Sequence, residues 1–243
     1  MEFKEYATPH EGNFIKEGRR LLGDQISIYS RLQEALMDYP AYFSREQHLS
    51  NIQKMYSLAT SSGLKELVNK TDPLVPWMAD EINTAIEGKQ VVDLGCCDGF
   101  FTTFYALNHP SPHFLGIDIA EGALRVAKLR ANKYHLRNIK WIQGDLLDPS
   151  MEEFFDADTI ILQDVLYQVF GSRDVQKEEK MLRLLGTYQH QGSIVVIGQE
   201  GNRIGSFQET SIGGYVLEDY RKNTVFDKNC GAHVTCEVAI FRR

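Results

Sequence analysis

The sequence predicts an α/β fold in which an N-terminal helical segment precedes a mostly parallel sheet. From residue 90 onward, short apolar stretches alternate with helical ones, which is typical of βαβ units. A turn that carries glycines follows the first of these stretches directly. The last two strand-like segments, 223–227 and 233–241, are joined by a short, turn-rich link. We therefore expect an antiparallel hairpin to close the sheet.

Helical periodicity dominates residues 1–87. Apolar side chains recur three and four positions apart in two runs, which predicts two amphipathic helices that need a partner surface. Ser44, followed three residues later by Gln47, predicts a capping box at the start of the second helix. Pro73 and Pro76 mark the approach to a third apolar segment. The two runs are Leu22, Ile26, Tyr29, Leu32 and Leu36, and then Leu49, Ile52, Met55 and Ala59.

Alternating strands and helices are predicted from residue 88 to the end of the chain. One face of the last strand consists of apolar residues at every second position. The helical periodicity of residues 1–87 predicts a helical lid over that range. The alternation of strands and helices predicts a sheet domain over residues 88–243. The strands before the hairpin lie near 90–95, 113–118, 138–143, 157–163 and 192–198, with helices near 99–108, 120–134 and 174–187. The apolar face of the last strand is Val234, Cys236, Val238 and Ile240.

Composition narrows the classes of partner. The chain has 243 residues and a formal net charge of −7, and this charge disfavours nucleic acid because a phosphate backbone would be repelled. No apolar run approaches bilayer length and the N-terminus lacks a signal-peptide core, so a cytoplasmic location without membrane contact is expected. The four cysteines lack metal-ligand spacing, and no metal is expected. The densest basic stretch is interpreted as a solvated helix face: Arg125, Lys128, Arg130, Lys133 and Arg137.

The most informative segment is the turn after the first predicted strand. Glycine there lets the backbone approach a ligand without an intervening Cβ. A dinucleotide-binding fingerprint would need glycine at 95, 97 and 100, whereas the chain has Gly95, Cys97 and Phe100. This disfavours a nicotinamide-dependent oxidoreductase. A tight turn with no ligand is the alternative interpretation.

Two carboxylates follow the next two predicted strands. Asp118 ends the second strand about 20 residues past the glycine turn, where a carboxylate can hold a ribose diol; capping of the helix that starts near Ala120 is the alternative. Asp145 follows Gly144 beyond the third strand. With Leu146 it could read adenine, by accepting a hydrogen bond from an exocyclic amine. A solvated loop acid is the alternative there.

Together these elements resemble class I S-adenosylmethionine-dependent methyltransferases. The resemblance covers residues 88–243 and implies a seven-stranded, doubly wound sheet, S-adenosylmethionine as cofactor and methyl transfer as activity. It also implies that Asp118 binds ribose and that Asp145 and Leu146 flank adenine. Cys97 departs from the family's glycine pattern, and its thiol would narrow the loop. The expected cofactor-binding residues are Asp93, Gly95, Cys97, Gly99, Phe100, Asp118, Ile119, Gly144, Asp145, Leu146 and Gln163.

The acceptor side is predicted from the segment after the fourth strand. Asp164 and Tyr167 are the catalytic candidates there, because active-site groups gather at the carboxyl ends of such strands. Helix capping and core packing are the alternative roles. Aromatic side chains in residues 1–87 suit a wall over a small-molecule acceptor. An RNA methyltransferase and a non-catalytic binding protein remain alternatives, and a homodimer is one option for assembly.

Overall fold

The computed structural model describes residues 1–7, 14–37, 44–165, 185–187, 189, 192–199, 211–212, 214–227 and 232–243. Its α-helices are α1 Phe3–Tyr6, α2 Phe14–Leu22, α3 Ile26–Met37, α4 Arg45–Ser61, α5 Leu64–Thr71, α6 Val75–Ala85, α7 Phe100–Asn108 and α8 Glu121–Lys133, and its 3₁₀ helices are η1 Gly23–Gln25 and η2 Pro149–Phe154. The strands are β1 Gln90–Leu94, β2 His113–Asp118, β3 Ile139–Gln143, β4 Thr159–Gln163, β5 Ser193–Gln199, β6 Ser211–Ile212, β7 Tyr215–Asp227 and β8 Ala232–Arg242.

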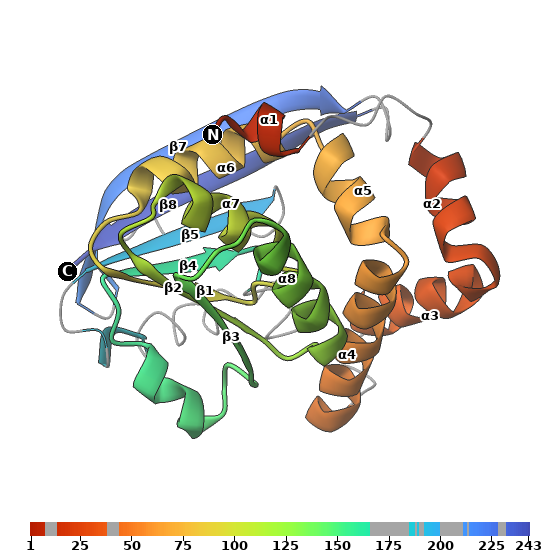
Figure 1. Ribbon diagram of the computed structural model, residues 1–243, viewed down its shortest axis with the longest axis horizontal. Helices are drawn as coiled ribbons and strands as arrows, with labels where there is room; N and C mark the ends of the chain where they lie inside the picture. Colours follow the sequence, from red (N-terminus) through yellow and green to blue (C-terminus); the bar gives the residue numbers. More distant parts are fainter. Residues whose placement is uncertain are drawn as a thin grey trace.

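One mixed sheet runs through the molecule in the order β3-β2-β1-β4-β5-β8-β7-β6 (Figure 1). The first five strands of this order are parallel, while β8 is antiparallel to β5 and β7 is antiparallel to β8. The predicted parallel sheet with a terminal antiparallel hairpin is therefore confirmed. The two-residue strand β6 at the edge was not predicted.

Strand β7 is longer than predicted, because it begins at Tyr215 rather than near 223. Its first half contains Glu218, Asp219, Arg221 and Lys222, which argues against a strand when the sequence is taken alone. In the structure β7 pairs with β8 along its whole length but with β6 only near its start. Among the described residues, no strand pairs with the other edge of β7 beyond its start, so charged side chains there can remain solvated.

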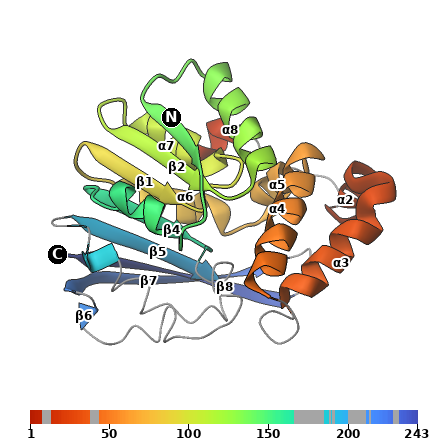
Figure 2. The same ribbon diagram turned by 90° about the horizontal axis from the view of Figure 1, so that it is seen from below.

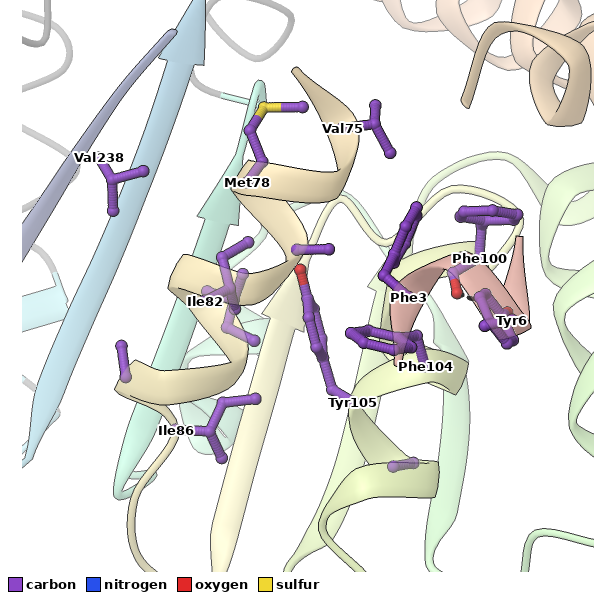
Figure 3. Close-up of a cluster of buried hydrophobic side chains, with 14 of the residues drawn as sticks. Phe3, Tyr6, Val75, Met78, Ile82, Ile86, Phe100, Phe104, Tyr105 and Val238 are labelled. Carbon is purple, nitrogen blue, oxygen red and sulfur yellow. Dashed lines mark hydrogen bonds between the residues drawn. The ribbon is translucent and has the colours of Figure 1, made fainter. Parts of the chain in front are cut away.

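Alternation along the strands sends side chains into two cores. Val92 and Leu94 of β1 belong to the core on one face of the sheet, which η2 helps to cover, while Val91 belongs to the core on the other face. The predicted apolar face of β8 is confirmed, since Cys236, Val238 and Ile240 lie in the second core. In that core, α6 and α7 pack side by side on the sheet (Figure 3).

The N-terminal region divides between the sheet and the lid. Helix α1 packs on α7, where the rings of Phe3 and Phe104 are 5.1 Å apart and the Tyr6 hydroxyl donates to the Phe100 carbonyl oxygen at 2.7 Å (Figure 3). Helix α6 also lies on the sheet. Helices α2 to α5, in contrast, gather beyond the end to which the parallel strands point (Figures 1 and 2). We call α2 to α5 the helical lid.

Local signals account for much of the lid. The predicted capping box is confirmed, since Ser44 accepts from the Gln47 amide and the Gln47 side chain accepts from the Ser44 amide. The apolar run from Leu22 to Leu36 does not form one helix, however. It is broken at η1, where Gly23 has a φ of 52°, a conformation that favours glycine.

Some predictions fall outside the described residues. Tyr167 is among them, and of the helix predicted at 174–187 only residues 185–187 are described; these are helical. In the part of the chain that the structure describes, none of the helices is both long and apolar enough to traverse a bilayer.

Candidate cofactor and active site

The loop between β1 and α7 turns sharply at the carboxyl end of the sheet. Gly95 and Gly99 have φ values of 79° and 63°, which favour glycine. A Cβ on Gly95 would lie 2.3 Å from Cγ2 of Val165, and one on Gly99 would lie 2.3 Å from the Trp141 ring. Packing within the protein therefore requires both glycines, independently of any ligand.

Cys97 occupies the middle of this loop. Its φ of 52° is uncommon for a residue with a side chain. The thiol is buried, and burial raises the pKa of Cys97 well above its ordinary value, so the side chain stays a neutral thiol near pH 7. Cys97 lines the pocket described below, and its amide is held by the neighbouring strand end.

Asp118, at the end of β2, is the residue that holds the Cys97 amide. One carboxylate oxygen accepts from the Cys97 amide and the other from the Ala120 amide, both at 2.8 Å. Asp118 thus fixes the glycine loop and the start of α8 together, although Ala120 rather than Asp118 is the N-cap. Burial raises the pKa of Asp118, against these two backbone hydrogen bonds. Each oxygen retains a second lone pair that could accept from a ligand hydroxyl.

Asp145 lies beyond the end of β3 and contacts the lid. Its carboxylate accepts from Nη2 of Arg45 through both oxygens at 2.8 Å, and Oδ1 also accepts from the Leu147 amide at 3.0 Å. The alternative of a solvated loop acid is wrong for this conformation, because Asp145 is ion-paired and only partly exposed. Arg45, the first residue of α4, was not predicted to take part in the site.

One pocket unites most of the predicted residues. Its sheet side contains the end of β2 and the residues that follow β1, β3 and β4, and its other wall is the lid. The predicted residues that line it are Gly95, Cys97, Asp118, Ile119, Gly144, Asp145, Leu146, Gln163 and Asp164. Asp93 lines a smaller pocket that shares Gly95, Cys97, Gln163 and Asp164 with the first.

Two predicted residues are placed elsewhere. Gly99 and Phe100 line neither pocket in the described part of the chain. The Phe100 ring is 2% exposed and packs against Phe3 and Tyr6. As the first residue of α7 it turns towards the core between α1 and α7, so its side chain belongs to the core rather than to the pocket. Asp164, with a φ of 52°, lines both pockets.

The lid contributes residues that sequence reasoning did not assign to the site. The main pocket is lined on this side by Leu49, Ile52 and Tyr56 of α4 and by Lys65 of α5. In addition, the side-chain amide of Gln53 donates to the Ile119 carbonyl oxygen at 3.1 Å. The periodicity of α4 predicted an amphipathic helix. It could not show that part of its apolar face would lie over the strand ends instead of over another helix.

Asp93, on the strand that leads into the glycine loop, is partly protonated near neutral pH. Burial raises the pKa of Asp93 to about 7, against the hydrogen bond that the Thr102 hydroxyl donates at 2.5 Å. Asp93 is on β1 and 4% exposed. Desolvation disfavours the charged form of a carboxyl group, so this residue supplies a weaker negative charge to the site than its type suggests.

The interpretation of the basic stretch as a solvated helix face is wrong for Arg130. Its side chain is only 12% exposed and its Nη2 lies 2.9 Å from Asp98 and 3.4 Å from Glu66. The guanidinium also lies 5.0 Å from the centroid of the Phe100 ring, a cation–π distance. Arg130 therefore joins α8, the glycine loop and lid helix α5, while Arg125, Lys128, Lys133 and Arg137 are exposed as expected.

Comparison with known proteins identifies the family. A family model described as a methyltransferase domain matches residues 86–230. The chain belongs to this methyltransferase family. The enzyme is an S-adenosylmethionine-dependent methyltransferase, as the resemblance implied. No protein with a curated description matches the sequence.

Solved structures with this fold act on different substrates. A precorrin-6y C5,15-methyltransferase from Geobacter metallireducens is 11% identical, with a TM-score of 0.52 over 69% of this chain and 88% of that one. A methyltransferase from Geobacter sulfurreducens in complex with S-adenosylhomocysteine is 15% identical, with a TM-score of 0.51 over 71% and 93%. A candidate RNA methyltransferase from Pyrococcus horikoshii is 17% identical, with a TM-score of 0.50 over 69% and 81%. At these identities the similarity shows the fold and leaves the acceptor class open.

The residues present fit the adenosyl cofactor. Hydroxyls need acceptors, and Asp118 lines the pocket with lone pairs available on both oxygens. An exocyclic amine needs an acceptor at a strand end, where Asp145 lies beside the buried Leu146. The sulfonium and ammonium groups are cationic, and Asp164 lines the junction of the two pockets. The individual roles of these residues remain predictions that binding measurements can test.

Proposed function

We propose that the enzyme transfers the methyl group of S-adenosylmethionine to an oxygen or nitrogen atom of a small molecule. The observation that carries this proposal is the covered pocket. Leu49, Ile52 and Tyr56 of α4 lie across the strand ends next to Asp118 and Asp145, so largely apolar side chains cover one side of the site. Such a wall suits a small, partly apolar acceptor and excludes water from the transfer step.

The bound cofactor supplies an electrophilic methyl group on a sulfonium that becomes neutral on transfer. The remaining requirement is alignment of donor and acceptor, together with loss of a proton from the acceptor. Asp164 lines the junction of the two pockets, where its carboxylate can accept that proton or orient the acceptor. Tyr167, three residues further on, remains the second candidate for this role.

Label transfer tests the acceptor class. Purified enzyme is incubated with methyl-tritiated S-adenosylmethionine and either the low-molecular-weight fraction or the total RNA of a cell extract. We expect label in the small-molecule fraction and none in RNA. Label that appears only in RNA would overturn the proposal, and boiled enzyme is the control for uncatalysed methylation.

Binding tests the predicted role of Asp118. We expect Asp118→Ala to weaken S-adenosylmethionine binding by about 1–3 kcal/mol, because hydrogen bonds to a charged group are lost. Isothermal titration calorimetry measures the change. Asp118→Asn retains one acceptor oxygen and is expected to lose less affinity than Asp118→Ala. Unchanged affinity in a folded Asp118→Ala variant would remove Asp118 from the cofactor site.

An RNA acceptor is the second candidate, and one observation favours it. Residues 122–144 contain six basic residues and no acidic ones, and Arg125, Lys128, Lys133, Arg137 and Lys140 are exposed. Contacts with phosphates release counterions, so binding to RNA through this segment would weaken steeply as salt is raised. Salt-sensitive RNA binding that falls when Arg125 and Lys128 are replaced by glutamine would favour this alternative.

A further inference from the structure

The two pockets meet at a single basic side chain. Among the described residues that line either pocket, Lys65 of α5 is the one lysine or arginine, and it lines both. The other ionisable side chains with a formal charge there are carboxylates, namely Asp93, Asp98, Asp118, Asp145 and Asp164. An isolated cation in such an acidic setting calls for an explanation.

The helix that carries Lys65 is attached to the glycine loop through the neighbouring residue Glu66. Glu66 accepts from Lys70 at 2.6 Å and contacts Arg130 at 3.4 Å, and Arg130 in turn pairs with Asp98 of the glycine loop at 2.9 Å. Asn69, one turn after Lys65 and 4% exposed, lines the smaller pocket with it. Residues four apart lie on one helix face, so Lys65 and Asn69 face the smaller pocket together.

The charge of Lys65 acts on the loop but is not neutralised by it. Burial raises the pKa values of Asp118 and Cys97, whereas the charge of Lys65 lowers both, which places the ammonium within electrostatic range of the two residues. Within the part of the chain that the structure describes, Lys65 nevertheless forms no ion pair. Its charge is thus available to an anionic group in the pocket.

The cofactor carries one such group. S-adenosylmethionine has a sulfonium, an ammonium and a single carboxylate, so the carboxylates around the pockets suit its two cations but would repel its one anion. We propose that Lys65 of the lid binds the carboxylate of the methionyl part of the cofactor, with Asn69 beside it. The proposal rests on the assigned cofactor and is independent of the acceptor class.

This assignment gives α5 a role in binding the methyl donor. Lid helix α4 covers the pocket with apolar side chains, while α5 adds the charge that matches the end of the cofactor opposite adenine. An ammonium–carboxylate contact in a partly buried site is a charge-assisted hydrogen bond, which is stronger than a neutral one. Lys65 would therefore discriminate between the amino-acid form of the cofactor and an analogue that lacks the carboxylate.

Calorimetry with two ligands tests the proposal. S-adenosylmethionine and decarboxylated S-adenosylmethionine are titrated into wild type, Lys65→Met, Lys65→Arg and Lys54→Met. We expect Lys65→Met to bind S-adenosylmethionine about 10- to 100-fold more weakly, with little change in affinity for the decarboxylated ligand. Lys65→Arg should recover part of the loss. Lys54→Met, at an exposed lysine of lid helix α4 that lines neither pocket, should bind both ligands as wild type does.

Each other outcome overturns the assignment in a distinguishable way. Equal binding of S-adenosylmethionine by wild type and Lys65→Met would show that Lys65 does not contact the carboxylate. An equal loss for both ligands would show that Lys65 supports the fold of the site, which thermal unfolding of the variant would corroborate. Failure of the wild type to bind either ligand would overturn the proposal together with the cofactor assignment.

Discussion

The two walls of the pocket are built in different ways. On the sheet wall, carboxylates are held by backbone amides close by, as Asp118 is held by Cys97 and Ala120. On the lid wall, side chains reach across long stretches of sequence, as Arg45 reaches Asp145 and Arg130 reaches Glu66. The sheet wall is therefore a rigid base formed by strand ends, whereas the position of the lid depends on a few side-chain contacts.

The lid itself is attached unequally at its two ends. At α5, Glu66 contacts Arg130 of α8, whose side chain is only 12% exposed and which also pairs with the buried Asp98. At the start of α4, by contrast, the Arg45 and Asp145 side chains are 36% and 26% exposed. Burial strengthens an ion pair that is already formed and makes its disruption costly. The difference indicates that α5 is the fixed end of the lid and that the start of α4 is the end that can open.

The largest effect is expected from breaking the buried attachment. Arg130→Met leaves the Asp98 carboxylate buried without its partner, and we expect the free energy of unfolding to fall by about 3–5 kcal/mol. Urea unfolding followed by circular dichroism measures it. The double variant Arg130→Met/Asp98→Asn removes the uncompensated charge and should recover part of the loss. A loss below about 1 kcal/mol would show that neither the Arg130–Asp98 pair nor the contact of Arg130 with Glu66 of α5 contributes much to stability.

A change in the sheet wall should have the next largest effect. Gly95→Ala places a Cβ at positive φ and against Val165, and we expect a loss of about 2–4 kcal/mol from backbone strain and overpacking. The contribution of the clash is separated by a double-mutant cycle with Val165→Ala. In the Val165→Ala background, Cγ2 is gone but Cβ of residue 165 remains 2.9 Å away, so Gly95→Ala should cost less than in wild type but more than the backbone term of about 1–2 kcal/mol. An equal cost in both backgrounds would exclude the predicted clash.

The raised pKa of Asp93 predicts how cofactor-free protein responds to pH. Because burial raises this pKa to about 7, the folded state keeps a proton that the unfolded state releases near pH 4. The contribution of Asp93 to stability is then greatest at low pH and falls as pH rises towards 7, by about 2–3 kcal/mol between pH 5 and pH 8. Asp93→Asn cannot release this proton and should lack that part of the pH dependence in urea unfolding. The same slope in both proteins would contradict the shifted pKa.

The smallest effect on stability is expected at the start of α4. Arg45→Gln removes a half-exposed ion pair, and we expect the free energy of unfolding to change by less than about 1 kcal/mol. The cavity under the lid is about 110 Å³, below the roughly 300–1,000 Å³ of typical small-molecule sites, so we expect α4 to shift when the cofactor enters. Stopped-flow fluorescence should show faster association of S-adenosylmethionine with Arg45→Gln than with wild type. Slower or unchanged association would mean that this pair does not restrain the lid.

Much of the sheet wall could be predicted from local sequence. The turn after β1, the carboxylate at the end of β2 and the Gly144–Asp145 pair after β3 each follow an apolar strand, and the carboxyl ends of parallel strands meet at one edge. The residues Gly95, Asp118 and Asp145 accordingly line one pocket. Phe100 was misplaced because the start of a helix after such a turn can face either the ligand or the core, and only α1 decides which.

The sequence by itself determined the parallel sheet, its terminal hairpin, the capping box of α4 and the strand ends that carry the site, because each depends on residues a few positions apart. Only the tertiary structure decided which face of α4 covers the pocket, that Lys65 stands between the two pockets, and that Arg130 is buried against Asp98. Periodicity shows that a helix has an apolar face but contains no information about the surface it meets. That information comes from contacts between residues far apart in the chain, which form only when the lid packs on the finished sheet.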